Sequence, residues 1–337
     1  MTILVTGGAG YIASHVVHEL VDQGRPVIVV DNLSTGFRNA VPAAVPLFAV
    51  DCGNEELMRR LMIKYQVDAV LHFAASTVVP QSIADPVSYY RNNTAQSLEL
   101  VSAAVGVGIK HFIFSSTAAV YGNVNVQSVG EDTPCRPMSP YGASKLMAET
   151  ILHDVASVSN MTCVALRYFN VAGADPKLRT GQSTRHASHL IKLAVQAALG
   201  VRKSLDIYGT DYPTRDGTCI RDYVHVSDLA AAHVQALDYL RSGGASVTLN
   251  CGYGRGYTVR EVVEAVKRVS GVDFTLSERE RRPGDPACIV AEARAIRRLL
   301  SWAPVFDDLE AIVSHALAWE KKLLSGYMSS HLPGGES

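Results

Sequence analysis

The sequence predicts an α/β fold, in which helices cover both faces of a doubly wound parallel sheet and a smaller α/β lobe is interleaved with it. Short apolar runs alternate with helix-period segments through the first half of the chain. These runs are almost continuously apolar, as in parallel strands that are buried on both faces. The chain also has 337 residues, more than one typical domain. Repeated right-handed βαβ units of this kind give a doubly wound sheet.

Six strands are predicted in the first half, at 3–6, 27–30, 47–50, 69–73, 112–114 and 163–166. The first helix lies between the first two strands. Its apolar residues Ile12, Val16 and Leu20 recur at helical spacing, and Gly24 stands where a helix commonly ends. A later apolar run at 247–250 can return to the same sheet.

The pattern changes after about residue 170, where a polar stretch at 173–185 leads into a helix and then into a turn-rich region at 208–217. We therefore predict a first domain at 1–170, rejoined by the strand near 247–250, and a second lobe at 171–324. Residues 325–337 include a Pro-Gly-Gly run and are predicted to form a flexible tail.

Composition excludes several classes of function. Hydrophobic residues make up 47% and charged residues 19%, an ordinary globular balance, and the net charge of −1 gives no field that would recruit nucleic acid or an anionic membrane. The six cysteines are far apart with no CxxC pair, so neither a disulfide framework nor a metal site is expected. With no membrane-length apolar run and no basic-then-apolar leader, we expect a cytoplasmic protein that binds a small molecule.

The turn between the first strand and the first helix has the glycine spacing of a Rossmann-type dinucleotide site. Gly7 permits the tight turn, Gly10 lets the backbone approach a pyrophosphate at the helix N-terminus, and Ala13 still allows close packing. Asp31 ends the second strand, where its carboxylate can accept hydrogen bonds from the adenosine ribose and would repel a ribose phosphate. The predicted cofactor is therefore NAD rather than NADP.

Two other strand ends allow both a functional and a structural interpretation. Asp51, after the third strand, can reach the adenine edge or remain a solvated acid. The small residues Ala74 and Ala75, after Phe73, can admit the dinucleotide or simply satisfy packing.

The sharpest chemical signal is a Tyr-x-x-x-Lys pair that follows a typical helix start, Ser139-Pro140. Tyr141 and Lys145 are four residues apart and share one helical face. An ammonium beside a phenol lowers the pKa of the phenol, as a general base requires. The strand at 112–114 leads into three residues with hydroxyl groups. One of these hydroxyls can reach the same substrate oxygen as Tyr141.

These residues resemble the extended short-chain dehydrogenase/reductase family, that of the NAD-dependent epimerases and dehydratases, and more closely its UDP-glucose 4-epimerases. The resemblance covers roughly residues 2–319. The glycine turn and the Tyr/Lys pair mark only the superfamily, and later motifs narrow it to nucleotide-sugar 4-epimerases. Those motifs include Arg167-Tyr168-Phe169-Asn170, Asp211-Tyr212-Pro213-Thr214, Arg221-Asp222-Tyr223-Val224-His225-Val226 and Arg281-Arg282-Pro283-Gly284-Asp285.

The resemblance implies an isomerase that interconverts UDP-glucose and UDP-galactose. Tyr141 would take the proton from the sugar 4-hydroxyl, Lys145 would tune Tyr141 and bind the nicotinamide ribose, and Thr117 would serve where these epimerases often carry serine. Hydride would pass from the sugar to NAD, leaving a 4-keto intermediate. That intermediate would turn about its link to the pyrophosphate and take the hydride back on its other face, so NAD is not consumed.

The resemblance also implies two sets of binding residues. Those expected to contact the nucleotide sugar are Thr117, Tyr141, Asn170, His189, Leu190, Tyr208, Arg221, Arg282 and Asp285. Those expected to contact NAD are Gly7, Gly10, Tyr11, Ile12, Asp31, Asn32, Asp51, Cys52, Phe73, Ala74, Ala75, Asn92, Ser115, Tyr141, Lys145 and Tyr168. The two arginines suit the phosphates, and Tyr208 can stack on uracil. Without the resemblance, a surface ion pair would account for each arginine.

Two positions depart from the family pattern. Thr77 replaces a lysine that several epimerases place near the cofactor phosphates, which predicts weaker retention of NAD. Ile289 stands where some relatives carry a large tyrosine and others a small residue, opposite the sugar 2-substituent. A residue of intermediate size leaves acceptance of UDP-GlcNAc and UDP-GalNAc open.

The alternatives to this reaction are that of another nucleotide-sugar epimerase, a dehydratase or a decarboxylase of the same family, and a non-catalytic NAD-binding protein. Nucleotide-sugar dehydratases carry an acid directly after the strand-end hydroxyl, whereas here Thr117 is followed by Ala118 and Ala119, which disfavours elimination. Decarboxylation needs no such acid and stays open. A non-catalytic NAD-binding protein is expected to have lost Tyr141 or Lys145, and both are present.

The helices expected at 95–105 and 146–155 carry apolar residues beyond one core-facing stripe: Leu98, Val101 and Val105 on the first, and Met147, Ile151 and Val155 on the second. Core packing against the sheet is one explanation. The resemblance implies instead that these helices pair across a four-helix homodimer interface. The expected partners are thus a UDP-sugar and a second copy of the chain, with neither nucleic acid nor membrane.

Overall fold

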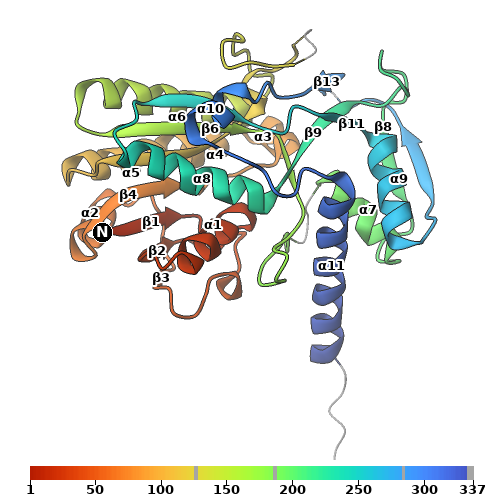
Figure 1. The fold of residues 1–337 in the computed structure, drawn as a ribbon, viewed down its shortest axis with the longest axis horizontal. Helices are drawn as coiled ribbons and strands as arrows, with labels where there is room; N and C mark the ends of the chain where they lie inside the picture. Colours follow the sequence, from red (N-terminus) through yellow and green to blue (C-terminus); the bar gives the residue numbers. More distant parts are fainter. Residues whose placement is uncertain (125–127, 185–187, 283–284, 332–337) are drawn as a thin grey trace, which may run out of the picture.

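The computed structural model describes residues 1–124, 128–184, 188–282 and 285–331, and its larger part is a seven-stranded sheet (Figure 1). The strand order is β10-β6-β5-β4-β1-β2-β3, and all neighbours pair in parallel. The predicted doubly wound sheet is therefore confirmed. Its strands are β1 (Thr2–Thr6), β2 (Val27–Val30), β3 (Leu47–Phe48), β4 (Val67–His72), β5 (His111–Thr117), β6 (Thr162–Tyr168) and β10 (Val247–Cys251).

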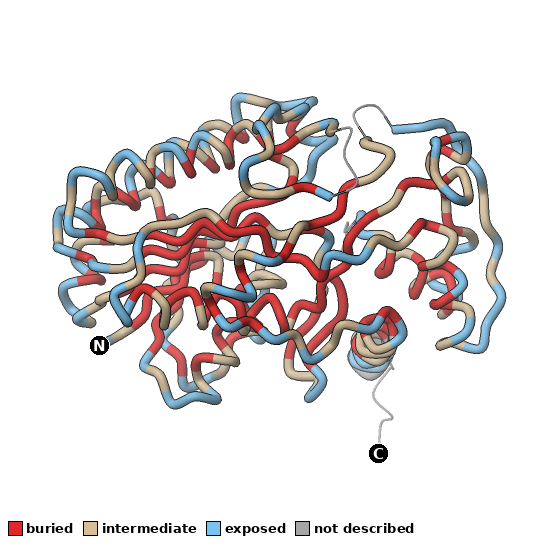
Figure 2. The backbone as a smooth tube through the Cα atoms, turned by 45° about the horizontal axis from the view of Figure 1, so that its top comes forward, coloured by how far each residue is buried: buried red, intermediate tan, exposed pale blue. Residues whose placement is uncertain are grey.

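Helices cover both faces of this sheet, which explains why the central strands are apolar throughout. In β1, Ile3 and Val5 belong to one core and Leu4 to the other, because successive side chains of a strand point to opposite faces. The first core lies under α1 (Tyr11–Asp22) and α8 (Val226–Arg241). The second lies under α2 (Glu55–Lys64), α5 (Gln96–Gly106) and α6 (Pro140–Val158). Figure 2 shows the buried strands between helices whose outer turns are exposed.

A smaller lobe lies at one end of the molecule (Figure 1, right). One small sheet contains β7 (Asn170–Ala172), β9 (Ile220–His225), β11 (Gly256–Thr258) and β13 (Cys288–Ile289). Another pairs β8 (Leu205–Tyr208) with β12 (Leu276–Arg279). The helices α7 (Leu190–Ala198), α9 (Val259–Ser270) and α11 (Leu309–His331) pack on one another. Shorter elements are η1 (Arg38–Ala40), α3 (Val79–Ala84), α4 (Pro86–Tyr89), η2 (Tyr90–Ala95) and η3 (Ala118–Val120).

The two parts are interleaved more extensively than the sequence predicts. β10 lies at the edge of the main sheet. The helices α8 and α10 (Arg294–Leu300), which also belong to the second half of the sequence, pack on that sheet too. The physical reason for α8 is that a parallel strand needs a crossover connection, and a helix over the sheet face supplies it.

Most predicted strand ends differ from the structure by a few residues, and two segments differ for a clear physical reason. The strand predicted at 47–50 covers only 47–48, because it is an edge strand that pairs on one side alone. The tail predicted from residue 325 begins as helix, since α11 continues to His331. Buried Leu309, Ile312 and Val313 anchor this helix, and a nucleated helix propagates through weak helix formers. Residues 332–337 lie outside the described residues.

All six cysteines are free. Within the described ranges, no three His, Cys, Asp or Glu side chains are grouped so that they could hold a metal ion. No helix of the described part is long and apolar enough to cross a membrane.

Candidate active site

The glycine turn between β1 and α1 is held tightly against the end of β4. Gly7 has a φ of +70°, and a Cβ at this position would lie 2.7 Å from the backbone nitrogen of Ala74. Gly10 is the N-cap of α1 and brings no side-chain cap, so the first N–H groups of the helix stay available to an anion. This donor set fits the pyrophosphate of a dinucleotide.

We expect Gly7→Ala to lower both the melting temperature and the NAD content of the protein. The methyl group would strain a left-handed residue, at about 1 kcal/mol, and would also displace the backbone of Ala74. Gly24→Ala is the matched control, because Gly24 has a φ of +68° but open space around its Cα. Thermal unfolding and the absorbance of released NAD measure the two effects. Equal losses in both variants would show that the close approach to Ala74 is unimportant.

Asp31, directly after β2, holds the glycine turn. Its Oδ2 accepts a hydrogen bond from the Ala9 nitrogen at 2.9 Å, and its Oδ1 accepts one from the Leu33 nitrogen at 2.8 Å. Burial raises the pKa of this carboxyl group, and the two N–H donors oppose the rise. Each carboxylate oxygen can accept more than one hydrogen bond, so a ribose hydroxyl can be bound as well.

Other residues expected around NAD lie after β2, after β3 and in η2. Asn32 accepts a bond from the Ser34 nitrogen at 3.0 Å, and Asp51 is exposed. Cys52 is buried, and burial raises the pKa of its thiol to about 12. Asn92 donates to the hydroxyl of Ser76 at 3.1 Å.

The segment after β4 is half-buried over Phe73, Ala74 and Ala75 and becomes exposed at Thr77. The Phe73 ring lies 4.6 Å from the imidazole of His233, measured between centroids. The backbone of Ala74 lies against the glycine turn, and Ala74 also packs against the second core.

Tyr11 and Ile12 open α1, and Tyr11 links the two lobes. The Tyr11 hydroxyl donates to the carbonyl oxygen of Gly173 at 2.7 Å, just after β7. Ile12 is half-buried and packs against the first core. The turn expected to hold the cofactor is thus tied to the start of the second lobe.

β5 and α6 bring the three expected catalytic residues together. The Ser139 hydroxyl caps α6 by accepting a bond from the Gly142 nitrogen at 3.2 Å. Lys145 Nζ donates to the Ser115 carbonyl oxygen at 2.9 Å. The Thr117 side chain lies close enough to Tyr141 to lower the pKa of its phenol. Thr117, Tyr141 and Lys145 are all buried.

A second hydroxyl pair borders the site. The Ser115 Oγ and the Tyr168 hydroxyl are 2.8 Å apart, so the ends of β5 and β6 are joined where NAD is expected. The Lys145 Nζ also lies 4.8 Å from the centroid of the Phe114 ring. The Lys145 ammonium group is therefore held by residues of β5 and does not depend on contacts with solvent.

Burial dominates the pKa values at this site. Burial raises the pKa of Tyr141, Tyr168 adds to the rise, and the side chain of Thr117 opposes it. Burial lowers the pKa of Lys145 to about 7, against the field of Glu149. The sequence predicts that Lys145 lowers the pKa of Tyr141, but Lys145 is not among the groups that act on that phenol in the chain by itself, and burial raises its pKa.

Sequence analysis missed an ion pair directly behind these residues. Glu149 lies one helical turn after Lys145 and forms a buried pair with Arg167 of β6, with an Nη2–Oε2 distance of 2.6 Å. Glu149 also accepts a hydrogen bond from the Ser116 hydroxyl. The four-residue spacing of Tyr141, Lys145 and Glu149 was the available signal.

The residues expected to bind phosphate lie in the second lobe. Arg221 of β9 is nearly buried and donates from Nη2 to Asp285 Oδ1 at 3.1 Å. The Arg282 guanidinium lies 3.8 Å from the ring centroid of Tyr208 in β8. In this structure Tyr208 is thus stacked with an arginine, where the sequence predicts stacking on uracil. Pro283 and Gly284 of the same motif lie outside the described residues.

The remaining three residues of the substrate set come from other elements. Asn170 is exposed in β7, with Tyr223 as its register partner. His189 precedes α7, with its Nδ1 3.0 Å from the Gln182 Nε2, and Leu190 is the first residue of that helix.

Ile289 connects the two ends of the site. It is the register partner of Arg221 in the pairing of β13 with β9. It also belongs to a buried cluster with Ala118 and Phe169, and Ala118 directly follows Thr117. The expected sugar-pocket residue therefore lies between the catalytic strand end and the arginine pair.

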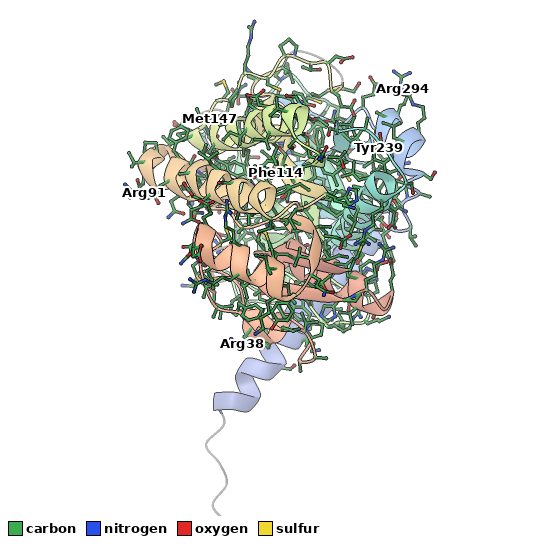
Figure 3. All side chains as sticks on the ribbon, turned by 90° about the vertical axis from the view of Figure 1, so that its left-hand side faces the viewer. Arg38, Arg91, Phe114, Met147, Tyr239 and Arg294 are labelled. Carbon is green, nitrogen blue, oxygen red and sulfur yellow. The ribbon has the colours of Figure 1, made fainter. Side chains whose placement is uncertain are left out.

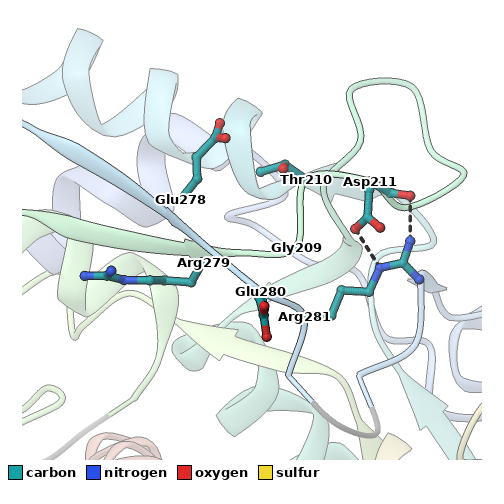
Figure 4. Close-up of a pocket in the computed structure, with 7 residues that line it drawn as sticks. All are labelled: Gly209, Thr210, Asp211, Glu278, Arg279, Glu280 and Arg281. Carbon is teal, nitrogen blue, oxygen red and sulfur yellow. Dashed lines mark hydrogen bonds and ion pairs between the residues drawn. The ribbon is translucent and has the colours of Figure 1, made fainter.

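An open cavity of about 400 Å³ lies at the carboxyl ends of β8 and β12, next to Tyr208 and Arg282 in the sequence. Figure 4 shows Arg281 reaching across to Asp211, with an Nε–Oδ1 distance of 2.7 Å. Three carboxylates line this cavity, from Asp211, Glu278 and Glu280. Arg279 and Arg281 also line it, so the charge of this cavity is mixed, and it gives no reason to move the expected diphosphate site away from Arg221 and Arg282.

Comparisons with known proteins agree with this geometry. The sequence model of the NAD dependent epimerase/dehydratase family matches residues 3–252. A UDP-glucose 4-epimerase of Azospirillum brasilense is 55% identical over 99% of this chain and 96% of its own length. A solved UDP-glucose-4-epimerase from Stenotrophomonas maltophila, with bound NAD and formylated UDP-arabinopyranose, is 36% identical with a TM-score of 0.94, covering 97% of this chain and 99% of that one. One from Brucella ovis in complex with NAD is 41% identical with a TM-score of 0.91, covering 94% and 97%.

Proposed function

The chain belongs to the NAD dependent epimerase/dehydratase family, and on that premise we propose that it interconverts UDP-glucose and UDP-galactose by inverting C4 of the hexose. The reaction is an isomerisation, and NAD is the cofactor. The observation that carries the proposal is the meeting of Thr117, Tyr141 and Lys145 at the end of β5, in a chain whose arginine pair is joined to that end through Ile289.

Each of the expected site residues has a separate role in the proposed reaction. Tyr141 Oη takes the proton of the sugar 4-hydroxyl, and the Thr117 hydroxyl orients the phenol and the reacting oxygen. When bound, NAD supplies the hydride acceptor and a positive charge beside the phenol. Lys145, with a pKa lowered to about 7, is partly protonated at neutral pH and can hold a ribose hydroxyl. Arg221 and Arg282 keep the diphosphate in place while the 4-keto sugar rotates about its bond to that diphosphate.

The residue after Thr117 supports epimerisation over elimination. Ala118 is buried against Ile289 and has no proton to give to a leaving hydroxyl. Without an acid to protonate the leaving hydroxyl, the oxidised sugar would not lose water, and the hydride would return to C4. Decarboxylation needs no such acid and is not addressed by this residue.

One incubation tests the proposal. The purified protein, first without and then with added NAD, is incubated with UDP-galactose and with UDP-N-acetylgalactosamine, and the products are separated. UDP-glucose is expected from the first substrate, and the second tests whether Ile289 leaves space for an acetamido group. A 4-keto-6-deoxy product, or no turnover even after addition of NAD, would contradict the proposal.

We also propose a homodimer that pairs α5 and α6 with the same helices of a second copy. Of the apolar residues expected there, Val101 is in the core, whereas Leu98 and Met147 are 47% and 46% exposed. Both line a shallow apolar cavity with Tyr90, Thr94 and Ala95. Figure 3 looks onto this face, with Met147 on α6.

Placing charged side chains on that face of α5 and α6 tests the dimer. Leu98→Lys with Met147→Lys is expected to give a monomer by sedimentation at micromolar concentration, because two like charges would be buried in each half of the interface. Val158→Lys is the control, since Val158 is 86% exposed at the end of α6 and away from the cavity. A wild-type chain that sediments as a monomer would refute the dimer.

A cytoplasmic setting is part of the same proposal. The six cysteines are free, and burial raises the pKa of several of their thiols, including Cys52 and Cys163. Protonated, buried thiols are poor nucleophiles and suit a reducing compartment.

A further inference from the structure

The turn that follows β4 has a backbone held by buried side chains, although its own side chains are exposed. The Val78 nitrogen donates to the Tyr89 hydroxyl at 2.9 Å, and that hydroxyl donates to the Val78 carbonyl oxygen at 2.7 Å. Tyr89 lies in α4 and is 1% exposed. Thr77, Val78 and Val79 are all exposed. A loop with a fixed backbone and accessible side chains is a common place for binding residues.

A second side chain holds the same turn two residues earlier. Asn93 accepts a hydrogen bond from the Ser76 nitrogen at 2.8 Å and donates one to the Ser76 carbonyl oxygen at 2.9 Å. It also donates to the Ser144 hydroxyl at 3.1 Å, and Ser144 donates to the carbonyl oxygen of Tyr141 at 2.8 Å. Residues 76–78 are thus connected by hydrogen bonds to the backbone of the helix that carries the expected base.

The sheet places this turn between the glycine turn and the end of β5. β4 pairs with β1 on one side and with β5 on the other, so that His72 is level with Thr6 and with Phe114. The residues after His72 therefore leave the sheet between the glycine turn and residues 115–117, and the backbone of Ala74 does lie against the glycine turn. Ligands of open parallel sheets bind at this carboxyl edge.

We propose that Tyr89 is a positioning residue, whose hydroxyl fixes residues 77–79 as the wall of the reaction site between the glycine turn and Thr117. The inference rests on the proposed function for the reaction that this wall serves. Because Val78 is 40% exposed, water can satisfy its backbone groups when the Tyr89 hydroxyl is absent, and the fold persists. The turn then loses its fixed position beside the reacting atoms, where a displacement of about 1 Å can cost a hundredfold in rate.

Tyr89→Phe tests the inference, because phenylalanine keeps the buried ring and removes only the hydroxyl. With NAD at saturation, the kcat for UDP-galactose is expected to fall about tenfold or more. The Kd for UDP should stay within about twofold, since UDP has no hexose and its expected partners Arg221 and Arg282 lie in the second lobe. The melting temperature should change by less than about 3 °C. Tyr239→Phe, in α8 and packed on Gly244, is the control and should change none of these quantities.

Hydrogen exchange of single amides measures the bond between Tyr89 and Val78 without turnover. The Val78 amide is expected to exchange about tenfold faster in Tyr89→Phe than in the wild type, whereas the Ser76 amide, held by Asn93, should keep its rate. Unchanged exchange at Val78, or faster exchange with an unchanged kcat, would overturn the inference. Parallel losses of UDP affinity and melting temperature would make Tyr89 a structural residue only. If the wild type does not epimerise UDP-galactose, the proposed function fails, and the exchange rates still decide whether Tyr89 fixes the turn.

Discussion

Tyr141→Phe is expected to reduce the kcat for UDP-galactose by about a thousandfold or more, while the protein keeps its fold and its NAD. The variant loses the group that accepts the proton of the sugar 4-hydroxyl, and general-base catalysis contributes about a hundredfold to ten-thousandfold. Phenylalanine fills the same buried space next to Thr117, so packing is preserved. Turnover, NAD absorbance and thermal unfolding are measured on one preparation.

Two variants of the neighbouring threonine show whether the loss concerns the hydroxyl network. Thr117→Ser keeps a hydroxyl beside Tyr141 and should retain most of the activity, whereas Thr117→Val should lose about tenfold to a hundredfold. Tyr141→Phe with near wild-type turnover would exclude Tyr141 as the base. Loss of NAD from that variant would instead show that the hydroxyl serves cofactor binding.

The main sheet could be predicted from the sequence because burial on both faces leaves a strong signal. In β1 the residues Ile3, Leu4 and Val5 are all apolar, since neighbours in the strand serve different cores. The edge strand β3 lacks that constraint, and the prediction there was two residues too long. The position of Asp31 after β2 was sufficient to place it beside the glycine turn.

Long-range pairings left no comparable signal. The spacing of Lys145 and Glu149 shows that they share a helical face, but nothing in the sequence shows that Arg167, on a different element, will neutralise the glutamate. Similarly, nothing in the sequence shows that the Tyr89 hydroxyl will hold the backbone of the turn after β4. The direction of the Tyr141 pKa was missed because desolvation depends on three-dimensional burial.

The second large effect is expected from breaking the buried pair behind the catalytic helix. Arg167 donates from Nε and Nη2 to both oxygens of Glu149 and from Nη1 to the Tyr121 hydroxyl at 3.0 Å. The Tyr121 hydroxyl donates in turn to Asn250 at 2.7 Å. Arg167→Met would leave a buried carboxylate without a counter-charge, which lowers the free energy of unfolding by about 3–5 kcal/mol.

Urea unfolding at a fixed NAD concentration measures this loss, because NAD that binds only the native state would otherwise add to the apparent stability. The exposed pair of Arg60 and Glu56 gives the control, since Arg60→Met should cost about 0.5 kcal/mol or less. An Arg167→Met variant as stable as Arg60→Met would contradict the expected cost of an unpaired buried charge.

The double variant Arg167→Met with Glu149→Gln separates charge from packing. It should regain most of the stability, because the carboxylate that would have lost its partner is neutralised as well. Its activity should recover less completely. Ser116, which donates to Glu149, stands between Ser115, whose carbonyl holds Lys145, and Thr117, which lies beside Tyr141. A stable double variant with a lowered kcat would therefore show that the pair positions the end of β5 for catalysis, whereas full recovery of both quantities would limit its role to the fold.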